Sequence, residues 1–157
     1  MTHHWKKILT RVFFLFVIVG IVYATVRERE KNGRSDPAPG PAADGLGPVV
    51  VYYFHGYQRC SACVRTEKML RAAVKEAFPA EMKEGKVAFR NVNVEDPANA
   101  DLVERFHVTA RRPVISDEQH GPGPWEELMR SPRSAQDLQD MLKTVIGPML
   151  QRRKAGP

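Results

Sequence analysis

The sequence predicts an α/β fold with a central mixed sheet flanked by helices, placed behind an N-terminal transmembrane helix. The first observation is an almost continuous apolar run, Val49 to Phe54, which is typical of a central strand buried on both faces. The second is Cys60-Ser61-Ala62-Cys63, which follows that run and precedes a stretch with helical periodicity. The third is the alternation of strand-like and helix-like patterns along the rest of the chain.

Composition bounds the function. The chain of 157 residues suits one domain with appendages. Its formal charge is +6, and seven of the 24 basic and four of the 18 acidic residues precede Pro48, so the remainder carries +3. We find no basic stripe with interleaved aromatic residues, which argues against nucleic-acid binding. The sequence contains no Ser–His–Asp set and no phosphate-binding loop. It therefore gives no support to a hydrolase or to a nucleotide-dependent enzyme.

After a short tail over 1–7, residues 8–26 predict a transmembrane anchor. The segment from Val12 to Val26 holds 15 residues without a charge, or roughly 22 Å of helix. A span needs about 20 residues, and counting from Ile8 gives 19, with Arg11 able to extend to the headgroups. A secretory signal peptide with a cleavage box at Val22-Tyr23-Ala24 is the rival interpretation, and both stay open.

Residues 27–47 form a predicted linker, charged at first and then rich in Pro and Gly, which holds the domain over 48–150 off the membrane. A basic tail occupies 151–157. Basic residues flank both ends of the anchor, so charge does not decide its orientation. A short N-terminal tail and a dithiol cycle both favour a single-pass protein of the inner (cytoplasmic) membrane with its domain on the periplasmic side.

Within the domain, the helix that begins at Cys60 is expected to end at Pro79. A polar loop over 81–86 precedes a strand over 87–94, and Glu95-Asp96-Pro97 stops that strand. A short helix is expected over 99–106.

The C-terminal part predicts a connection into a short strand over 107–116, a turn over 117–124 and a short element over 125–129. Ser134 then caps a helix with an apolar face, which Gly147-Pro148 should end or kink.

This order of elements resembles the thioredoxin-like superfamily. The segments 51–56 and 89–97, together with Arg59-Cys60, are similar to the bacterial group labelled "nitrophenyl compound nitroreductase subunit ArsF family". The resemblance covers about 49–150 and implies a thioredoxin-like fold. The chain departs from thioredoxins proper, which carry Trp-Cys-Gly-Pro-Cys. Pro113 lies seven residues after Phe106 rather than six, so Arg112 stands where the cis-proline facing the thiols is usual, and Pro113 in that role is a hypothesis.

The cysteine pair is the candidate catalytic site. Exchange needs a thiolate, which a helix N-terminus and a neighbouring cation favour. Cys60, first in the helix and beside Arg59, is the predicted nucleophile, and Cys63, one turn on, is the predicted resolving thiol. A zinc site needs four ligands, and no second C-x-x-C or H-x₃₋₅-H exists, so we expect neither metal nor cofactor. A metal-binding pair and an inert pair stay open as alternatives.

Other residues near the pair have a functional and a structural interpretation. His55 either tunes the thiols or is a hydrogen-bonded structural residue, and Tyr57 either lines a substrate groove or packs over the helix start. Arg111 and Arg112 either shape an electropositive rim beside Cys60 or are solvated. We therefore predict a membrane-anchored thiol–disulfide oxidoreductase or electron carrier, monomeric, that acts on protein thiols. The alternative is a non-enzymatic tethered module that binds a partner or a metal through the same dithiol.

Overall fold

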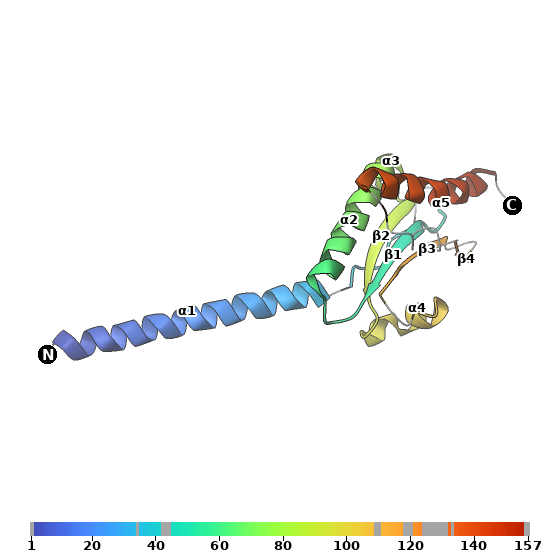
Figure 1. Ribbon diagram of the computed structural model, residues 1–157. Coiled ribbons are helices and arrows are strands. Elements are labelled where there is room, and N and C mark those ends of the chain that lie inside the picture. Colours follow the sequence, from blue (N-terminus) through green and yellow to red (C-terminus); the bar gives the residue numbers. More distant parts are fainter. Residues whose placement is uncertain are drawn as a thin grey trace. The chain divides into compact units, whose positions relative to one another are not determined.

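The computed structural model describes residues 2–33, 35–41, 45–108, 111–117, 121–123, 132 and 134–155, and in the first helix it describes side chains over 8–23. The chain divides into two compact units, Met1–Arg34 and Ser35–Pro157. Figure 1 labels the elements of both units. The second unit therefore includes residues that the sequence assigned to the linker.

The first unit is one helix, α1 (Thr2–Gly33), whose described large apolar side chains between Ile8 and Tyr23 are exposed. Among the described residues, no helix has both the length and the apolar character that a membrane crossing requires. The prediction of a transmembrane helix over 8–26 is therefore wrong, and so is the predicted fold class that included this helix. The uncharged run of 15 residues extends only about 22 Å, against about 30 Å for the hydrocarbon core of a bilayer.

The second unit is a mixed α/β structure around a four-stranded mixed sheet of order β2-β1-β3-β4. The central strand β1 pairs in parallel with β2, while β3 is antiparallel to both β1 and β4. Because β1 and β2 are parallel neighbours, the segment between them, which includes α2, is the crossover of a βαβ unit. The strands are β1 (Val49–His55), β2 (Val87–Asn93), β3 (Pro113–Asp117) and β4 (Gly121–Pro122).

Every residue of β1 is buried, which confirms the predicted central strand. Successive side chains of a strand point to opposite faces, so β1 supplies two cores. One face packs against α2 (Ser61–Ala77) and α5 (Ala135–Ala155), and the other packs against Phe106 and Val108, which follow α4 (Ala100–Arg105). Figure 1 shows the same arrangement, with α2 and α5 on one side of the sheet and α4 on the other.

Between α2 and β2 the structure corrects one predicted loop. The sequence predicted a stop at Pro79, and α2 does end at Ala77. Pro79 then begins a short helix, α3 (Pro79–Lys83), inside the region expected to be a polar loop. Proline suits the first position of a helix because its missing N–H has no intrahelical partner there.

The element expected over 99–106 is split into the 3₁₀ turn η1 (Pro97–Asn99) and α4. The side chain of Asp96 caps η1 by accepting from the Ala98 N–H at 3.0 Å. The short element expected over 125–129 lies outside the described residues.

The last helix, α5, begins after Ser134, whose hydroxyl accepts from the Asp137 N–H at 3.1 Å. The expected end or kink at Gly147-Pro148 is not a stop, since α5 continues to Ala155. Proline inside a helix costs about 3 kcal/mol. The apolar face outweighs that cost, because Ile146 and Met149 on either side of Pro148 are both buried in the core.

Candidate functional site

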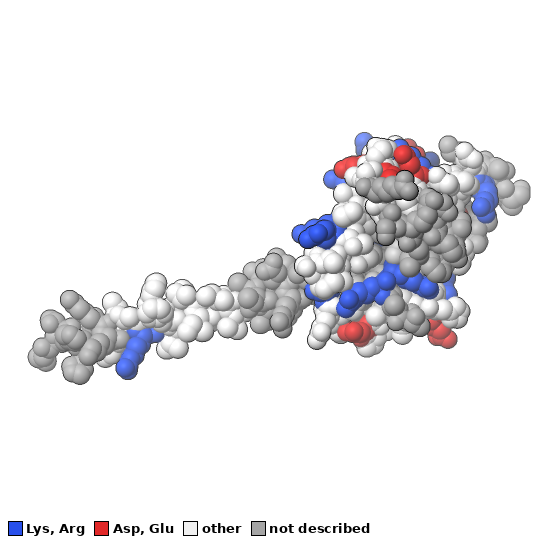
Figure 2. All heavy atoms as spheres, in the orientation of Figure 1, with Lys and Arg blue, Asp and Glu red and all other residues white. Residues whose placement is uncertain are grey.

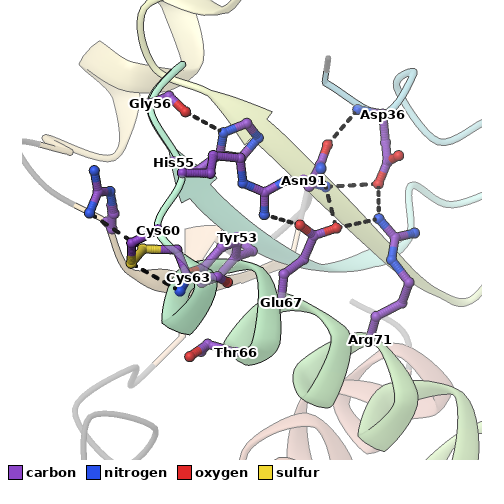
Figure 3. Close-up of polar contacts among 12 residues, drawn as sticks. Asp36, Tyr53, His55, Gly56, Cys60, Cys63, Thr66, Glu67, Arg71 and Asn91 are labelled. Carbon is purple, nitrogen blue, oxygen red and sulfur yellow. Dashed lines mark hydrogen bonds and ion pairs between the residues drawn. A yellow bond between two sulfur atoms is a disulfide. The ribbon is translucent and has the colours of Figure 1, made fainter. Parts of the chain in front are cut away.

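Cys60 and Cys63 form a disulfide at the N-terminus of α2, with Cα atoms 5.1 Å apart. Cys60 is the N-cap residue of this helix, and its sulfur accepts from the Cys63 N–H at 3.2 Å. Cys60 is exposed, whereas Cys63 is only 8% exposed. Figure 3 shows the bridge at the first turn of the helix. The outer sulfur is thus open to a partner, and a helix N–H is directed at it.

Two groups from other elements contact Cys63. Arg111, which precedes β3, approaches the Cys63 sulfur with Nη1 at 3.4 Å and donates from Nη2 to the Gln58 carbonyl at 2.9 Å. The hydroxyl of Tyr53, on β1, donates to the Cys63 carbonyl at 3.2 Å, and burial raises the pKa of Tyr53. Sequence reasoning left Arg111 either at an electropositive rim beside Cys60 or solvated, and the structure brings it to the sulfur of Cys63.

Arg59 was expected to favour the Cys60 thiolate by its charge. Its side chain is instead only 5% exposed and forms an ion pair with Glu67. Glu67 also accepts from Arg71 at 3.2 Å and from the Asn91 amide at 3.3 Å. The charge of Arg59 is therefore offset by the carboxylate of Glu67, and Figure 3 shows Glu67 with Arg71 and Asn91.

Sequence reasoning missed Glu67. Its position four residues after Cys63 places it on the same face of α2 as the buried second cysteine, and Arg71 follows at the spacing of a helical ion pair. These two signals mark an acid on a buried helix face. Burial raises the pKa of Glu67, but hydrogen bonds and charges from Arg59 and Arg71 outweigh burial and hold it below its ordinary value.

Part of the predicted linker belongs to the same network. Asp36 pairs with Arg71 at 2.7 Å and exchanges hydrogen bonds with Asn91, accepting from its backbone N–H at 2.9 Å and donating to its carbonyl at 3.0 Å. The Ser35 hydroxyl accepts from the Asn93 N–H at 2.9 Å. Since β2 is an edge strand, these residues satisfy backbone groups that an uncovered edge leaves unpaired.

His55, at the end of β1, is fully buried, and its Nδ1 lies 2.9 Å from the Gly56 carbonyl oxygen. A carbonyl only accepts, so the neutral ring donates from Nδ1. Burial lowers the pKa of His55, and the nearby charge of Arg59 acts in the same direction, while the bond to Gly56 opposes both. No hydrogen bond among the described residues joins His55 to either cysteine, so this geometry fits the structural interpretation.

The loop after β1 is held by Glu95, which sequence reasoning treated only as part of a strand-end pair. Its Oε2 accepts from the Tyr57 N–H at 3.0 Å. A Cβ at Gly56 would lie 2.7 Å from Glu95 Oε1, so a larger residue there would require the carboxylate to shift. The Tyr57 side chain is 59% exposed, so it does not pack over the start of the helix as a buried residue.

Arg112 and Pro113 lie at the start of β3. Arg112 donates to the carbonyls of Phe106 and His107 at 2.7 and 3.2 Å, and so ties the end of α4 to the sheet. Pro113 stands opposite Tyr53 in the antiparallel register. No peptide bond of the described chain is cis, so the hypothesis of a cis-proline at Pro113 is wrong.

Basic side chains cross the middle of the face of the globular unit that Figure 2 shows, with acidic side chains above and below them.

Within the described part of the chain, no three His, Cys, Asp or Glu side chains gather in a way that could hold a metal ion. The chemistry that the described geometry offers is therefore centred on the two sulfurs.

The chain matches no family model, and no curated protein and no solved structure matches it.

Proposed function

We propose that the globular unit is a thiol–disulfide oxidoreductase or electron carrier that cycles Cys60 and Cys63 between a dithiol and a disulfide. The observation that carries this proposal is the asymmetric pair: an exposed sulfur at a helix N-terminus is bridged to a buried sulfur one turn further on. The crossover position of α2 supports it, since a C-x-x-C beside a βαβ unit is typical of thioredoxin-like redox sites.

The difference in exposure between the two cysteines supports different roles for them. In the reductive direction the Cys60 thiolate attacks a partner disulfide, and a mixed disulfide forms as one partner thiolate leaves. The Cys63 thiolate then attacks the Cys60 sulfur and releases the second partner thiolate. Two electrons pass to the partner and the domain ends as a disulfide, and the oxidative direction is the reverse. Protein thiols are the proposed partners because Cys60 lies on the surface.

The test is a redox titration of the full chain in glutathione buffers, with the fraction of disulfide read by thiol alkylation. We expect one two-electron transition, and the same transition in Ser61→Ala as a matched control between the cysteines. With a model protein substrate, Cys63→Ser should accumulate the mixed disulfide, whereas Cys60→Ser should not.

Equal trapping by both cysteine variants would reject the assigned roles. A chain that never equilibrates with glutathione would reject the function itself. Stoichiometric binding of Cu(I) by the reduced chain, with no turnover in a disulfide-reduction assay, would instead favour a binding module that uses the same dithiol.

A further inference from the structure

Arg111 is the one described cation that touches a sulfur of the pair. Its guanidinium reaches two points at once: the buried Cys63 sulfur at 3.4 Å from Nη1 and the Gln58 carbonyl at 2.9 Å from Nη2. The second bond anchors the side chain to the loop that precedes α2. The fork geometry of a guanidinium allows both bonds from one planar group.

We propose that Arg111 is a catalytic residue that stabilises Cys63 as a thiolate and thereby directs the couple toward oxidation of partner thiols. This inference rests on the proposed function. A disulfide sulfur is neutral and a weak acceptor, whereas a thiolate is an anion, so the N–H···S contact strengthens when the bridge is reduced. A contact that is stronger in one state shifts the equilibrium toward that state.

The same contact acts on the rate. When a partner thiolate attacks the Cys60 sulfur, the bond between Cys60 and Cys63 breaks and Cys63 leaves with the electron pair. A better stabilised thiolate leaves faster. A second partner thiolate then attacks the mixed disulfide at the partner sulfur and displaces the Cys60 thiolate. The partner is oxidised to a disulfide, and the domain takes up two electrons as Cys60 and Cys63 become thiols.

The charges around the disulfide favour Arg111 over Arg59 as the cation that stabilises the Cys63 thiolate. Arg59 is adjacent in sequence to Cys60, but its charge is offset by Glu67. Among the described residues, no carboxylate forms an ion pair with Arg111. After reduction each sulfur has its own donor: the Cys63 N–H for Cys60, and the Arg111 guanidinium for Cys63.

The experiment compares Arg111→Met with Arg112→Met in the full chain. Both variants lose one arginine charge from adjacent positions, but Arg111 contacts a cysteine sulfur, whereas Arg112 donates to the Phe106 and His107 carbonyls. In glutathione buffers, the equilibrium constant for reduction of the domain should fall about tenfold in Arg111→Met, or about 30 mV for a two-electron couple. Arg112→Met should change it by less than about twofold, and Arg111→Lys should recover part of the loss because a cation is restored.

A second readout isolates the buried thiol. In a Cys60→Ser background only Cys63 reacts, and its alkylation rate against pH should show a midpoint at higher pH once Arg111→Met is added. A wild-type chain that equilibrates normally while Arg111→Met titrates unchanged would overturn this inference and leave the proposed function standing. Equal shifts in both arginine variants would also overturn it, because the effect would then be one of net charge. A wild-type chain that does not equilibrate would reject both.

Discussion

Among the described residues of the globular unit, two buried arginine–carboxylate pairs differ in what they connect. Arg153 and Asp117, 3% and 1% exposed, join α5 to β3, with Nη2–Oδ1 at 2.5 Å and Nε–Oδ2 at 3.2 Å. Arg59 and Glu67, 5% and 11% exposed, lie beside the disulfide. Both pairs hold opposite charges largely out of water, so removal of one partner is expected to lower stability.

The two carboxylates differ in how their oxygens are shared. Both oxygens of Asp117 accept from one guanidinium. The oxygens of Glu67 accept from Arg59, Arg71 and the Asn91 amide, and Arg71 continues to Asp36. The first pair thus acts as a clamp between a helix and the sheet. The second belongs to a chain of contacts that runs from Arg59, next to Cys60 in sequence, to the edge strand, so its removal should affect the redox equilibrium as well as the stability.

The largest expected effect is on the clamp. Arg153→Met leaves Asp117 buried without its guanidinium, and we expect the free energy of unfolding to fall by about 3–5 kcal/mol. Urea denaturation measures this, with the exposed neighbour Arg152→Met as the control. The glutathione equilibrium of Arg153→Met should match wild type. A loss of unfolding free energy below about 1 kcal/mol, or a shifted glutathione equilibrium, would contradict the proposed difference between the two pairs.

A smaller loss of stability, combined with a redox effect, is expected at the second pair. Glu67→Gln keeps the shape but removes the charge, and we expect about 2 kcal/mol of lost stability because Arg59 and Arg71 lose the carboxylate that they share. The positive charge next to Cys60 is then no longer offset by Glu67, so the glutathione equilibrium should move toward the reduced domain. Glu76→Gln on the exposed face of α2 is the control. An unchanged redox equilibrium in Glu67→Gln would show that the network does not reach the sulfurs.

The smallest effect is the dependence of stability on pH. The pKa of His55 is lowered in the fold, chiefly by burial, while an unfolded histidine titrates near 6.5. The unfolded chain therefore binds the extra proton first, and stability falls as pH drops below about 6.5 toward the folded pKa. The pKa of Glu67 is also lowered, so its contribution is present above its unfolded value of about 4.3 and is lost as pH falls through its folded pKa.

Urea denaturation between pH 7 and pH 3 separates the two groups. His55→Asn should remove the slope just below pH 6.5, because an amide can donate to the Gly56 carbonyl without titrating. Glu67→Gln should remove the loss at lower pH. If His55→Asn keeps the full slope below pH 6.5, the titrating group lies elsewhere in the chain.

The local pattern of apolar and polar residues predicted much of the fold. Three parts of the fold were predictable: the apolar run of β1, the helix that begins after Cys60 and the start of β2. The reason is that apolar residues recur along the sequence with the period of the strand or helix that they form. The same local reasoning failed at Pro148, because α5 passes through the proline where its apolar face packs in the core. It failed at α1 for a different reason, since no described helix is both long and apolar enough to cross a membrane.

The positions of the two cysteines, three apart after a buried strand and at the start of a helix, could be inferred from the amino-acid sequence. The charges that surround the sulfurs depend on the tertiary structure. Arg59 is adjacent to Cys60 in sequence, yet it forms an ion pair with Glu67. Arg111 lies 48 residues from Cys63 in sequence and contacts its sulfur. Side-chain partners across such separations depend on how strands and helices pack, and neither spacing nor composition records that arrangement.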